Sequence, residues 1–355
     1  AGARPNFIKI APIIKAIKKA QLNGKKIGFR LVHTGQHYDK NMSANFFDQL
    51  KIPHPDVNFE AGGGTQSEQT STIMLKYEAL LKEGSPDFCL VVGDVTSTMA
   101  CTIVAKKMKI KVLHVEAGIR SGDISMPEEI NRIVTDSLSD YFYTTSENAG
   151  KNLLRSGVPK EKIIFVGNTM IDTLLSNKNK FKKPSFWVDL NLVRKRYFIL
   201  TLHRPSNVDS GKLLEGFIEE VTANSNGYPV LFPVHPRLKK RIHNLEKIFK
   251  NLCVFEPLSY FEFNYLVENS LAVLTDSGGV TEETTVMNIP CITIRDSTER
   301  PETVSMGTNE LIGTQKKNIG PALKKILSGN WKKGEVPPMW DGKSSCRIIS
   351  HILSI

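Results

Sequence analysis

The sequence is short of the features that mark disulfide-rich, metal-binding and membrane-spanning proteins. It has five cysteines among 355 residues, an odd number with no CxxC pair, so neither a disulfide framework nor a zinc site is indicated. No apolar run approaches the roughly 20 residues that a bilayer-spanning helix needs. The opening residues also lack the basic stretch followed by an apolar one that a signal peptide requires. We therefore expect a cytoplasmic protein without a membrane partner.

Positive charge is in excess but is not concentrated anywhere. The formal net charge of +11 is carried largely by scattered lysine pairs such as Lys18-Lys19 and Lys324-Lys325. No basic arm or aromatic-interleaved stripe is present, so the pairs are typical of solvated helix faces, and we expect no nucleic-acid partner. A positive field would still steer a small anionic substrate towards the protein.

The chain does contain a repeated alternation of short apolar runs with stretches of helical period. Buried parallel strands joined by crossover helices are the physical solution to that pattern, so we predict an α/β fold. Helices are predicted at Phe7–Ala20, Ile319–Leu327 and Arg347–Ile355. Strands are predicted at Ile27–Val32, Phe88–Val92, Val112–Val115, Tyr141–Tyr143, Ile163–Val166, Tyr197–Leu202, Val230–Val234, Cys253–Phe255, Ala272–Leu274, Cys291–Ile294 and Glu310–Ile312.

A polar segment, residues 177–196, interrupts this alternation and contains Pro184. We interpret it as an interdomain connection. The prediction is two doubly wound, Rossmann-like domains facing a central cleft: residues 1–176, joined by a C-terminal helix at 343–355, and residues 177–342. The opening Ala1–Pro5 is typical of the loop after a first strand, and we expect that further residues precede it.

Polar residues directly after the predicted strands are the candidate site, because ligands bind at the carboxyl ends of strands in open parallel sheets. Asp94, Glu116 and Glu128 are the acidic candidates in the first half, although capping of a helix that begins at Pro127 could by itself explain Glu128. A carboxylate at position 116 must be solvated in a cleft or paired, since unpaired burial is costly. Arg120 and Arg132 are its candidate partners if it is paired.

The second half offers basic and glycine-rich candidates. His203-Arg204 suits diphosphate contact and proton transfer, although a lone histidine is more often structural. The run Asp276–Gly279 suits an anion at a helix start, and a plain N-cap explains it equally well. Glu283 could reach a ribose hydroxyl or simply favour the helix start. His33, His37, His114 and His235 lack metal-ligand spacing, so no metal site is expected.

Together these segments resemble the non-hydrolysing UDP-N-acetylglucosamine 2-epimerase family over almost the whole chain. Each motif is weak alone, but the ordered set is specific. The matching motifs are Gly2-Ala3-Arg4-Pro5 with Lys9, Thr34-Gly35-Gln36-His37, Gly93-Asp94, His114–Arg120, Pro127–Arg132, Gly167-Asn168-Thr169, His203-Arg204-Pro205, Pro233–Pro236, Thr275–Gly279 and Thr298–Glu302.

The resemblance implies a glycosyltransferase-B type architecture, a homodimer, and interconversion of UDP-GlcNAc and UDP-ManNAc through elimination of UDP to 2-acetamidoglucal. No cofactor is expected, in agreement with the absence of GxGxxG. The implied catalytic residues are Asp94, Glu116, Glu128 and His203. The implied substrate-binding residues are Arg4, Lys9, Arg204, His235, Phe263, Ser277, Gly278, Gly279, Glu283 and Arg300.

Departures from the family pattern keep several functions open. Tyr38, Asp39 and Pro205 stand where regulated members carry different residues, so activation by UDP-GlcNAc is predicted to be weak or absent. The segment Tyr38–Gln69 is similar to relatives acting on UDP-diacetamido-uronates, which keeps such a sugar as a possible substrate. A glycosyltransferase of the same fold, a hydrolysing epimerase and a basic nucleic-acid-binding protein are the competing interpretations.

Overall fold

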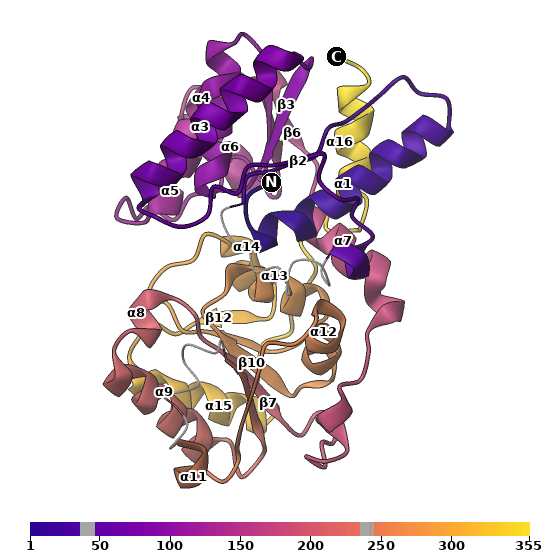
Figure 1. Cartoon of the computed structure of the whole chain (residues 1–355). Helices are drawn as coiled ribbons and strands as arrows, with labels where there is room; N and C mark the ends of the chain where they lie inside the picture. Colours follow the sequence, from indigo (N-terminus) through magenta and orange to yellow (C-terminus); the bar gives the residue numbers. More distant parts are fainter. Residues whose placement is uncertain (36–46, 235–241, 243–244) are drawn as a thin grey trace. The chain divides into compact units, whose positions relative to one another are not determined.

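The computed structural model describes the chain except residues 36–46, 235–241 and 243–244, together with the side chains of Arg4 and Pro205. The chain forms two compact units. The first comprises Ala1–Ser176 and Pro338–Ile355, and the second comprises Asn177–Pro337. Each unit is an α/β assembly in which the paired strands are parallel (Figure 1).

The first unit contains a four-stranded sheet in the order β3-β4-β5-β6. Val112, Leu113 and Val115 on the second of these strands are all buried. Burial on both faces explains why such strands occur in the sequence as continuous apolar runs. The strands are β3 (Phe88–Val92), β4 (Lys111–Val115), β5 (Tyr141–Thr144) and β6 (Ile163–Phe165).

Helices surround this sheet. The neighbours α3, α4 and α5 lie side by side, and α1 lies beside α16 although they come from opposite ends of the chain (Figure 1). The bounds are α1 (Arg4–Leu22), α3 (Gln66–Glu83), α4 (Thr96–Lys107), α5 (Pro127–Leu138), α6 (Glu147–Arg155), α7 (Thr169–Asn177) and α16 (Ser344–Ile352).

The predicted first strand, Ile27–Val32, is largely wrong. Only β1 (Val32–His33) is a strand there, and it pairs in parallel with β2 (Val57–Asn58), a strand that was not predicted. The preceding residues, 27–31, instead line a largely apolar cavity of about 690 Å³ together with residues of α1, α3 and β3. An apolar run therefore occurs here without a ladder: Leu31 is buried, and Ile27 and Phe29 are half-buried.

The second unit is built on one six-stranded parallel sheet in the order β12-β11-β10-β7-β8-β9. On β7, Phe198 and Leu200 pack into one apolar cluster, while Ile199 and the preceding Tyr197 pack into the cluster on the opposite face. The bounds are β7 (Phe198–Thr201), β8 (Val230–Pro233), β9 (Leu252–Phe255), β10 (Ala272–Thr275), β11 (Cys291–Thr293) and β12 (Asn309–Leu311).

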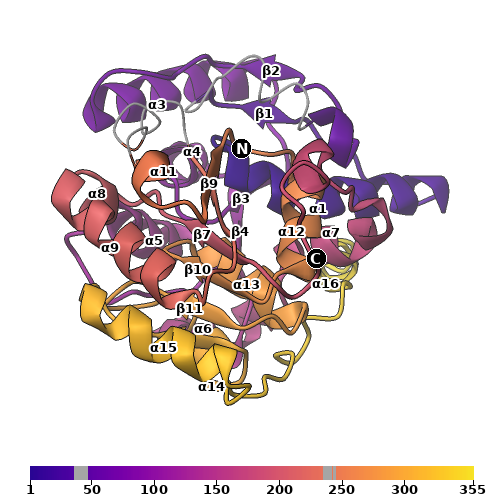
Figure 2. The same ribbon diagram turned by 90° about the horizontal axis from the view of Figure 1, so that it is seen from below.

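The helices of this unit cover both faces of its sheet. Apolar side chains of α9 and α15, which lie side by side (Figure 2), fill the cluster around Phe198. Leu266 and Val267 of α12 belong to the opposite cluster. The bounds are α8 (Pro205–Val208), α9 (Gly211–Asn224), α11 (Leu245–Ile248), α12 (Tyr260–Asn269), α13 (Gly278–Val286), α14 (Pro301–Ser305) and α15 (Ile319–Leu327).

The remaining ten predicted strands are confirmed, each within one residue at either end. The predicted helix Arg347–Ile355 is displaced, since α16 begins three residues earlier. The Asp172 carboxylate accepts the backbone N–H groups of Ser344 and Ser345 at 3.0 and 2.7 Å. Because the first N–H groups of a helix have no partner within the helix, this carboxylate lets the helix begin at Ser344.

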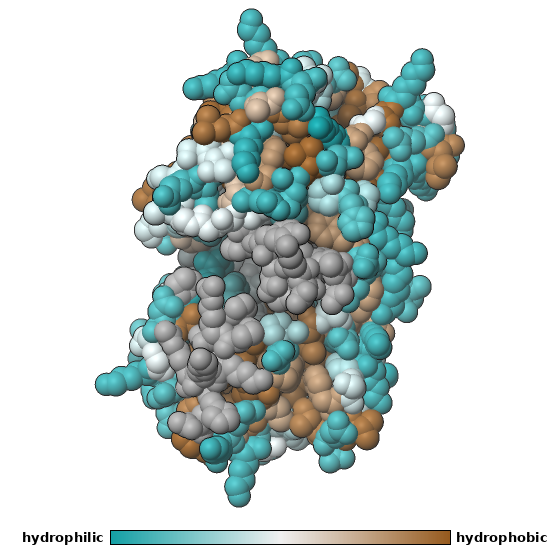
Figure 3. All heavy atoms as spheres, in the orientation of Figure 1, coloured by the Kyte–Doolittle hydropathy of each residue, from teal (hydrophilic) through white to brown (hydrophobic). Residues whose placement is uncertain are grey.

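Hydrophilic residues are dispersed over the surface. In the space-filling view, hydrophilic residues are spread across the visible face of both units and do not form a single stripe (Figure 3). Among the helices that the structure describes, none has the length and apolarity to cross a membrane.

Candidate active site

The strand ends of the first unit turn sharply into two acidic residues. Gly93 follows β3 with φ +72°, and Glu116 follows β4 with φ +68°. The backbone N–H groups of Glu116 and Ala117 both donate to the Tyr143 carbonyl, at 3.0 and 3.1 Å. A residue other than glycine rarely adopts positive φ, and such conformations are concentrated at functional sites. The turn directs the chain out of the sheet at Glu116, which the sequence analysis named as a candidate site residue.

Glu116 is buried and forms an ion pair. Its Oε2 lies 2.5 Å from Nζ of Lys9 on α1, and the two residues are only 3% and 7% exposed. Arg120 and Arg132, the candidate partners from the sequence, pair with Asp136 and Asp94. Lys9, which the resemblance assigns to the diphosphate, contacts Glu116 in this structure. The ion pair offsets part of the cost of burying both charges.

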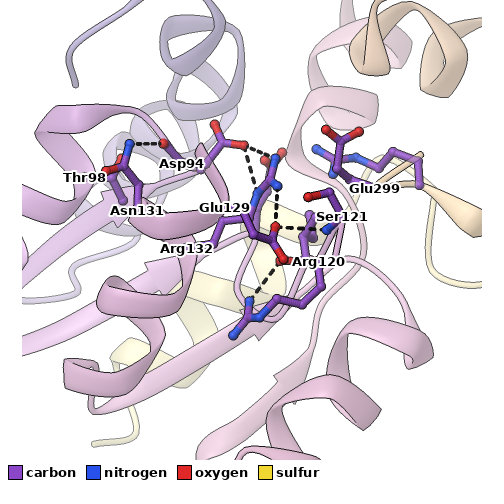
Figure 4. A network of polar contacts seen from close by, with 12 residues as sticks. Asp94, Thr98, Arg120, Ser121, Glu129, Asn131, Arg132 and Glu299 are labelled. Atoms are coloured by element: carbon purple, nitrogen blue, oxygen red, sulfur yellow. Dashed lines mark hydrogen bonds and ion pairs between the residues drawn. The ribbon is translucent and has the colours of Figure 1, made fainter. Parts of the chain in front are cut away.

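Asp94 is held by Arg132 from α5. The guanidinium Nε and Nη2 lie 3.1 and 2.5 Å from Oδ2 of Asp94, and Nη1 lies 2.9 Å from Glu129 (Figure 4). Asn131 on the same helix donates its amide to the Asp94 carbonyl at 2.9 Å. Both the backbone and the side chain of Asp94 are therefore positioned by α5.

The adjacent acids of the first turn of α5 have different environments. Glu129 is buried and accepts the backbone N–H groups of Ser121 and Gly122, at 2.9 and 3.1 Å. Burial by itself raises its pKa, but these donors and Arg132 hold the pKa of Glu129 below its ordinary value. Glu128 is exposed. Glu129 therefore anchors the 121–122 loop, and Glu128 is accessible to a ligand.

A buried histidine connects the two strand ends. His114 on β4 has Nδ1 at 2.7 Å from Asp136 and Nε2 at 2.9 Å from the Gly93 carbonyl. Asp136 also accepts the Gly118 N–H and the Arg120 guanidinium, at 3.1 and 2.6 Å. Burial raises the pKa of Asp136, but His114 and Arg120 outweigh it and lower that pKa. This network couples the turn before Asp94 to the segment after Glu116.

In the second unit, the buried carboxylate of Asp276 organises the corresponding strand ends. Its Oδ1 lies 2.6 Å from Nδ1 of His203. Its Oδ2 accepts the backbone N–H of Arg204 and the side-chain amide of Asn207, both at 3.0 Å. Burial raises the pKa of Asp276, but its bonds to His203 and these donors lower the pKa overall. His203 and Arg204 are thus brought beside the start of α13.

The glycine-rich turn at this position is a helix start, as predicted. Ser277 is the N-cap of α13, and its side chain makes no capping bond. Capping by the serine hydroxyl is therefore not used, and the first-turn N–H groups of Gly278 and Gly279 suit an anion. Phe263, on α12, is half-buried in the apolar cluster of that face.

Two predicted binding residues already have protein partners. Glu283 is buried and accepts the Tyr260 hydroxyl at 2.8 Å, and burial raises its pKa to about 7. The guanidinium of Arg300 forms a buried ion pair with Glu282. Glu299 lies between Arg295 and Arg204, at 2.7 and 3.2 Å.

Some predicted residues cannot be placed. His235, Tyr38 and Asp39 lie outside the described residues, as do the side chains of Arg4 and Pro205. The contacts that Arg132, Asp136 and Asp276 make were not predicted from the sequence. One available signal was spacing, because positions 129, 132 and 136 lie three and four residues apart and so share one helix face.

Comparison with known proteins identifies similar sequences along nearly the whole chain. A sequence profile of the family "UDP-N-acetylglucosamine 2-epimerase" matches residues 19–353. The UDP-N-acetylglucosamine 2-epimerase of Methanocaldococcus jannaschii is 41% identical, over 98% of this chain and 96% of its own. The UDP-2,3-diacetamido-2,3-dideoxy-D-glucuronate 2-epimerase of Pseudomonas aeruginosa is 37% identical, over 100% of this chain and 98% of its own.

Solved structures show the same fold. The M. jannaschii UDP-GlcNAc 2-epimerase in complex with UDP-GlcNAc and UDP has a TM-score of 0.88 at 41% identity, covering 100% of this chain and 98% of its own. The Neisseria meningitidis UDP-GlcNAc 2-epimerase bound to UDP-GlcNAc has a TM-score of 0.89 at 29% identity, with the same coverage.

Proposed function

The chain belongs to the UDP-N-acetylglucosamine 2-epimerase family, and from this premise we propose that it interconverts UDP-GlcNAc and UDP-ManNAc at C2. The observation that carries the proposal is the pair of carboxylates, Asp94 and Glu116, at the ends of adjacent strands. Each faces a cation, Arg132 or Lys9. Ionised carboxylates are bases, and their placement on a rigid sheet edge suits proton transfer to and from a bound sugar.

The proposed chemistry is elimination followed by re-addition. A carboxylate takes the proton from C2 while the bond between C1 and the diphosphate oxygen breaks, and UDP leaves with the bonding electron pair. The intermediate is 2-acetamidoglucal. UDP then adds back to C1 and a proton returns to C2 on the opposite face, which inverts that centre. Asp94, Glu116 and Glu128 supply the acid and base groups and stabilise positive charge at C1.

The second unit is proposed to hold the nucleotide. His203, Arg204 and Arg300 carry the donors for a diphosphate, together with the N–H groups of Gly278 and Gly279 at the start of α13. Phe263 is proposed to contact the uracil, and Glu283 a ribose hydroxyl. Lys9, Ser277, Arg4 and His235 complete the proposed substrate-binding set.

Deuterium uptake tests this function. The protein is incubated with UDP-GlcNAc in deuterated water, with no added cofactor or acceptor, and both epimers are analysed by NMR and mass spectrometry. Deuterium is expected at C2 of both epimers, because the acid and base groups exchange their protons with water. A little UDP and 2-acetamidoglucal should also be released. Epimerisation without deuterium at C2 would contradict the assignment of the carboxylates.

The same assay distinguishes the competing functions. A glycosyltransferase would leave C2 unlabelled, and a hydrolysing epimerase would accumulate free ManNAc. A chain specific for a diacetamido-uronate would ignore UDP-GlcNAc and act on the UDP-diacetamido-uronate supplied in a parallel reaction. A lag in the reaction from UDP-ManNAc that trace UDP-GlcNAc abolishes would show activation, which we propose to be weak.

We also propose a cytoplasmic homodimer. Its support is exposed apolar side chains on two helices of the first unit that both pack on α4: Leu75 of α3 and Ile130 and Ile133 of α5 are 69%, 46% and 41% exposed. Exposed apolar surface on a folded unit is a candidate association surface. Light scattering should give a dimer mass, and Leu75→Glu with Ile130→Glu should shift it to the monomer. A monomeric unsubstituted protein would contradict this part of the proposal.

A further inference from the structure

A buried carboxylate lies directly behind the exposed imidazole of His203. The His203 side chain is 62% exposed, and the Asp276 side chain is fully buried. Their Nδ1 and Oδ1 atoms are 2.6 Å apart. Because Asp276 is in contact with the ring on one side only, the opposite ring nitrogen, Nε2, is available to a ligand.

We propose that Asp276 is a positioning residue that fixes the tautomer and orientation of His203, an inference that rests on the proposed function. As a carboxylate, Asp276 can only accept a hydrogen bond, so Nδ1 of His203 must carry the proton. The neutral ring then presents a bare Nε2, and the charged ring presents an Nε2–H that can donate to a departing diphosphate. A carboxylate behind a catalytic imidazole has this effect in several unrelated folds.

The further contacts of Asp276 hold its carboxylate in one orientation. The Oδ2 atom accepts the Arg204 N–H and the Asn207 amide, and both carboxylate oxygens lie within 3.2 Å of the His203 N–H. Arg204 donates from Nε to the Asp276 carbonyl at 3.2 Å and also contacts Glu299. Rotation of the carboxylate would break several of these hydrogen bonds at once, because both of its oxygens accept from backbone or side-chain N–H groups. The ring of His203 therefore has a fixed acceptor to align against.

The same contacts allow a merely structural role, in which Asp276 only ties the start of α8 to the end of β10. An Asp276→Asn substitution separates the two roles because the amide has one donor group and one acceptor. If its NH₂ faces His203, Nδ1 must give up its proton and the tautomer reverses. If its oxygen faces His203, the NH₂ opposes the donors of Arg204 and Asn207, and the tautomer is kept.

The experiment combines ¹⁵N NMR of the His203 ring with a double-mutant cycle. Wild type, Asp276→Asn, His203→Gln, the double variant and the control Asn207→Ala are compared for kcat, UDP affinity and thermal unfolding. The neutral ring of the wild type is expected to be the Nδ1–H tautomer, and that of Asp276→Asn the Nε2–H tautomer. Asp276→Asn should lower kcat by about 10²-fold, whereas in the His203→Gln background it should change kcat by less than about threefold.

The control removes a bond to the second oxygen of the same carboxylate. Asn207→Ala should lower the melting temperature while keeping the Nδ1–H tautomer and a kcat within about threefold of wild type. An Nε2–H tautomer in the wild type, or equal losses of kcat from Asp276→Asn with and without His203, would overturn the proposal. The ¹⁵N spectrum of the wild type identifies the tautomer of His203 even if Asp276→Asn does not fold. A wild type that shows the Nδ1–H tautomer but does not epimerise UDP-GlcNAc would refute the proposed function and leave the Asp276–His203 pairing intact.

Discussion

The ends of the parallel strands carry opposite chemistry in the two units. In the first unit, the residues that follow the strands are acidic and each pairs with a cation from a helix, as in Asp94 with Arg132 and Glu116 with Lys9. In the second unit, the carboxylate of Asp276 is buried behind the ring of His203, and that ring is exposed. The proposed function assigns the carboxylates of the first unit to the sugar as acid and base groups, and the hydrogen-bond donors of the second unit to the diphosphate.

Buried carboxyl groups of the two units differ in the neighbours that they contact. Glu116 and Glu129 in the first unit each lie beside a cation. In the second unit, Glu299 lies beside Arg295, which outweighs the effect of burial and holds its pKa well below the ordinary value. Glu283 instead bonds the neutral Tyr260 hydroxyl, and burial raises its pKa to about 7. Burial alone therefore does not decide whether a carboxyl group is charged; its neighbour does.

The largest expected effect tests the bases of the first unit. Glu116→Gln should lower kcat by about 10³-fold, because a general acid or base of this kind contributes ~10²–10⁴-fold. UDP affinity should stay within about threefold, since Glu116 itself is assigned to the sugar. Steady-state kinetics and calorimetry measure the two effects, with the exposed Glu161→Gln of the first unit as the control. Full activity in Glu116→Gln would contradict the assignment of Glu116 as an acid or base group of the first unit.

The next effect is a loss of stability as pH rises, caused by Glu283. In the folded protein its pKa is about 7, against an ordinary value of 4.5. Between these values the folded state holds a proton that the unfolded state has released, so stability falls as pH rises through this window. The fall should be about 3 kcal/mol, because one pKa unit corresponds to about 1.4 kcal/mol.

Chemical denaturation at pH 4.5 and pH 7.5, for the wild type and Glu283→Gln, measures this effect. The substituted protein should lose the contribution of Glu283 and so fall less in stability over the same range. An identical pH dependence in the two proteins would show that Glu283 does not titrate in this window.

Substitution of Glu128 should lower activity, whereas substitution of the adjacent Glu129 should lower stability. Glu128→Gln should lower kcat by about 10²-fold with unchanged stability, because its side chain is exposed and assigned to the sugar. Glu129→Gln should lower the free energy of unfolding by ~1–3 kcal/mol, because Arg132 and the Ser121 and Gly122 N–H groups lose a charged acceptor. Urea unfolding and steady-state kinetics on both variants decide this. A stability loss confined to Glu128→Gln would reverse the assignment.

The smallest effect concerns an exposed ion pair of the second unit. Lys325 and Glu310 lie 3.1 Å apart, and their side chains are largely or partly exposed. Lys325→Met should change the free energy of unfolding by less than about 0.5 kcal/mol, since water screens such pairs. Urea unfolding measures it, and Lys325→Arg, which keeps the charge, is the matched control. A change above about 2 kcal/mol would make this pair comparable to a buried one such as Lys9–Glu116.

Much of the fold was predictable because its signal is local. A strand such as β10 is buried on both faces, so its residues form one apolar run, and the polar residue after the run marks the strand end. The prediction failed at residues 27–31, where the same apolar character lines a cavity, and at β2, which has only two residues. A short apolar run therefore shows neither that all of its side chains are buried nor that its backbone pairs with another strand.

The sequence by itself therefore determined the alternation of strands and helices, the family resemblance, and the polar residues that end each strand. Only the tertiary structure decided their partners. It placed Lys9, 107 residues away, against Glu116, and Asp276 behind His203. It also buried Glu129 and left Glu128 exposed. The reason is physical: an ion pair depends on distances of a few ångströms between groups that the chain brings together only when its strands and helices have packed.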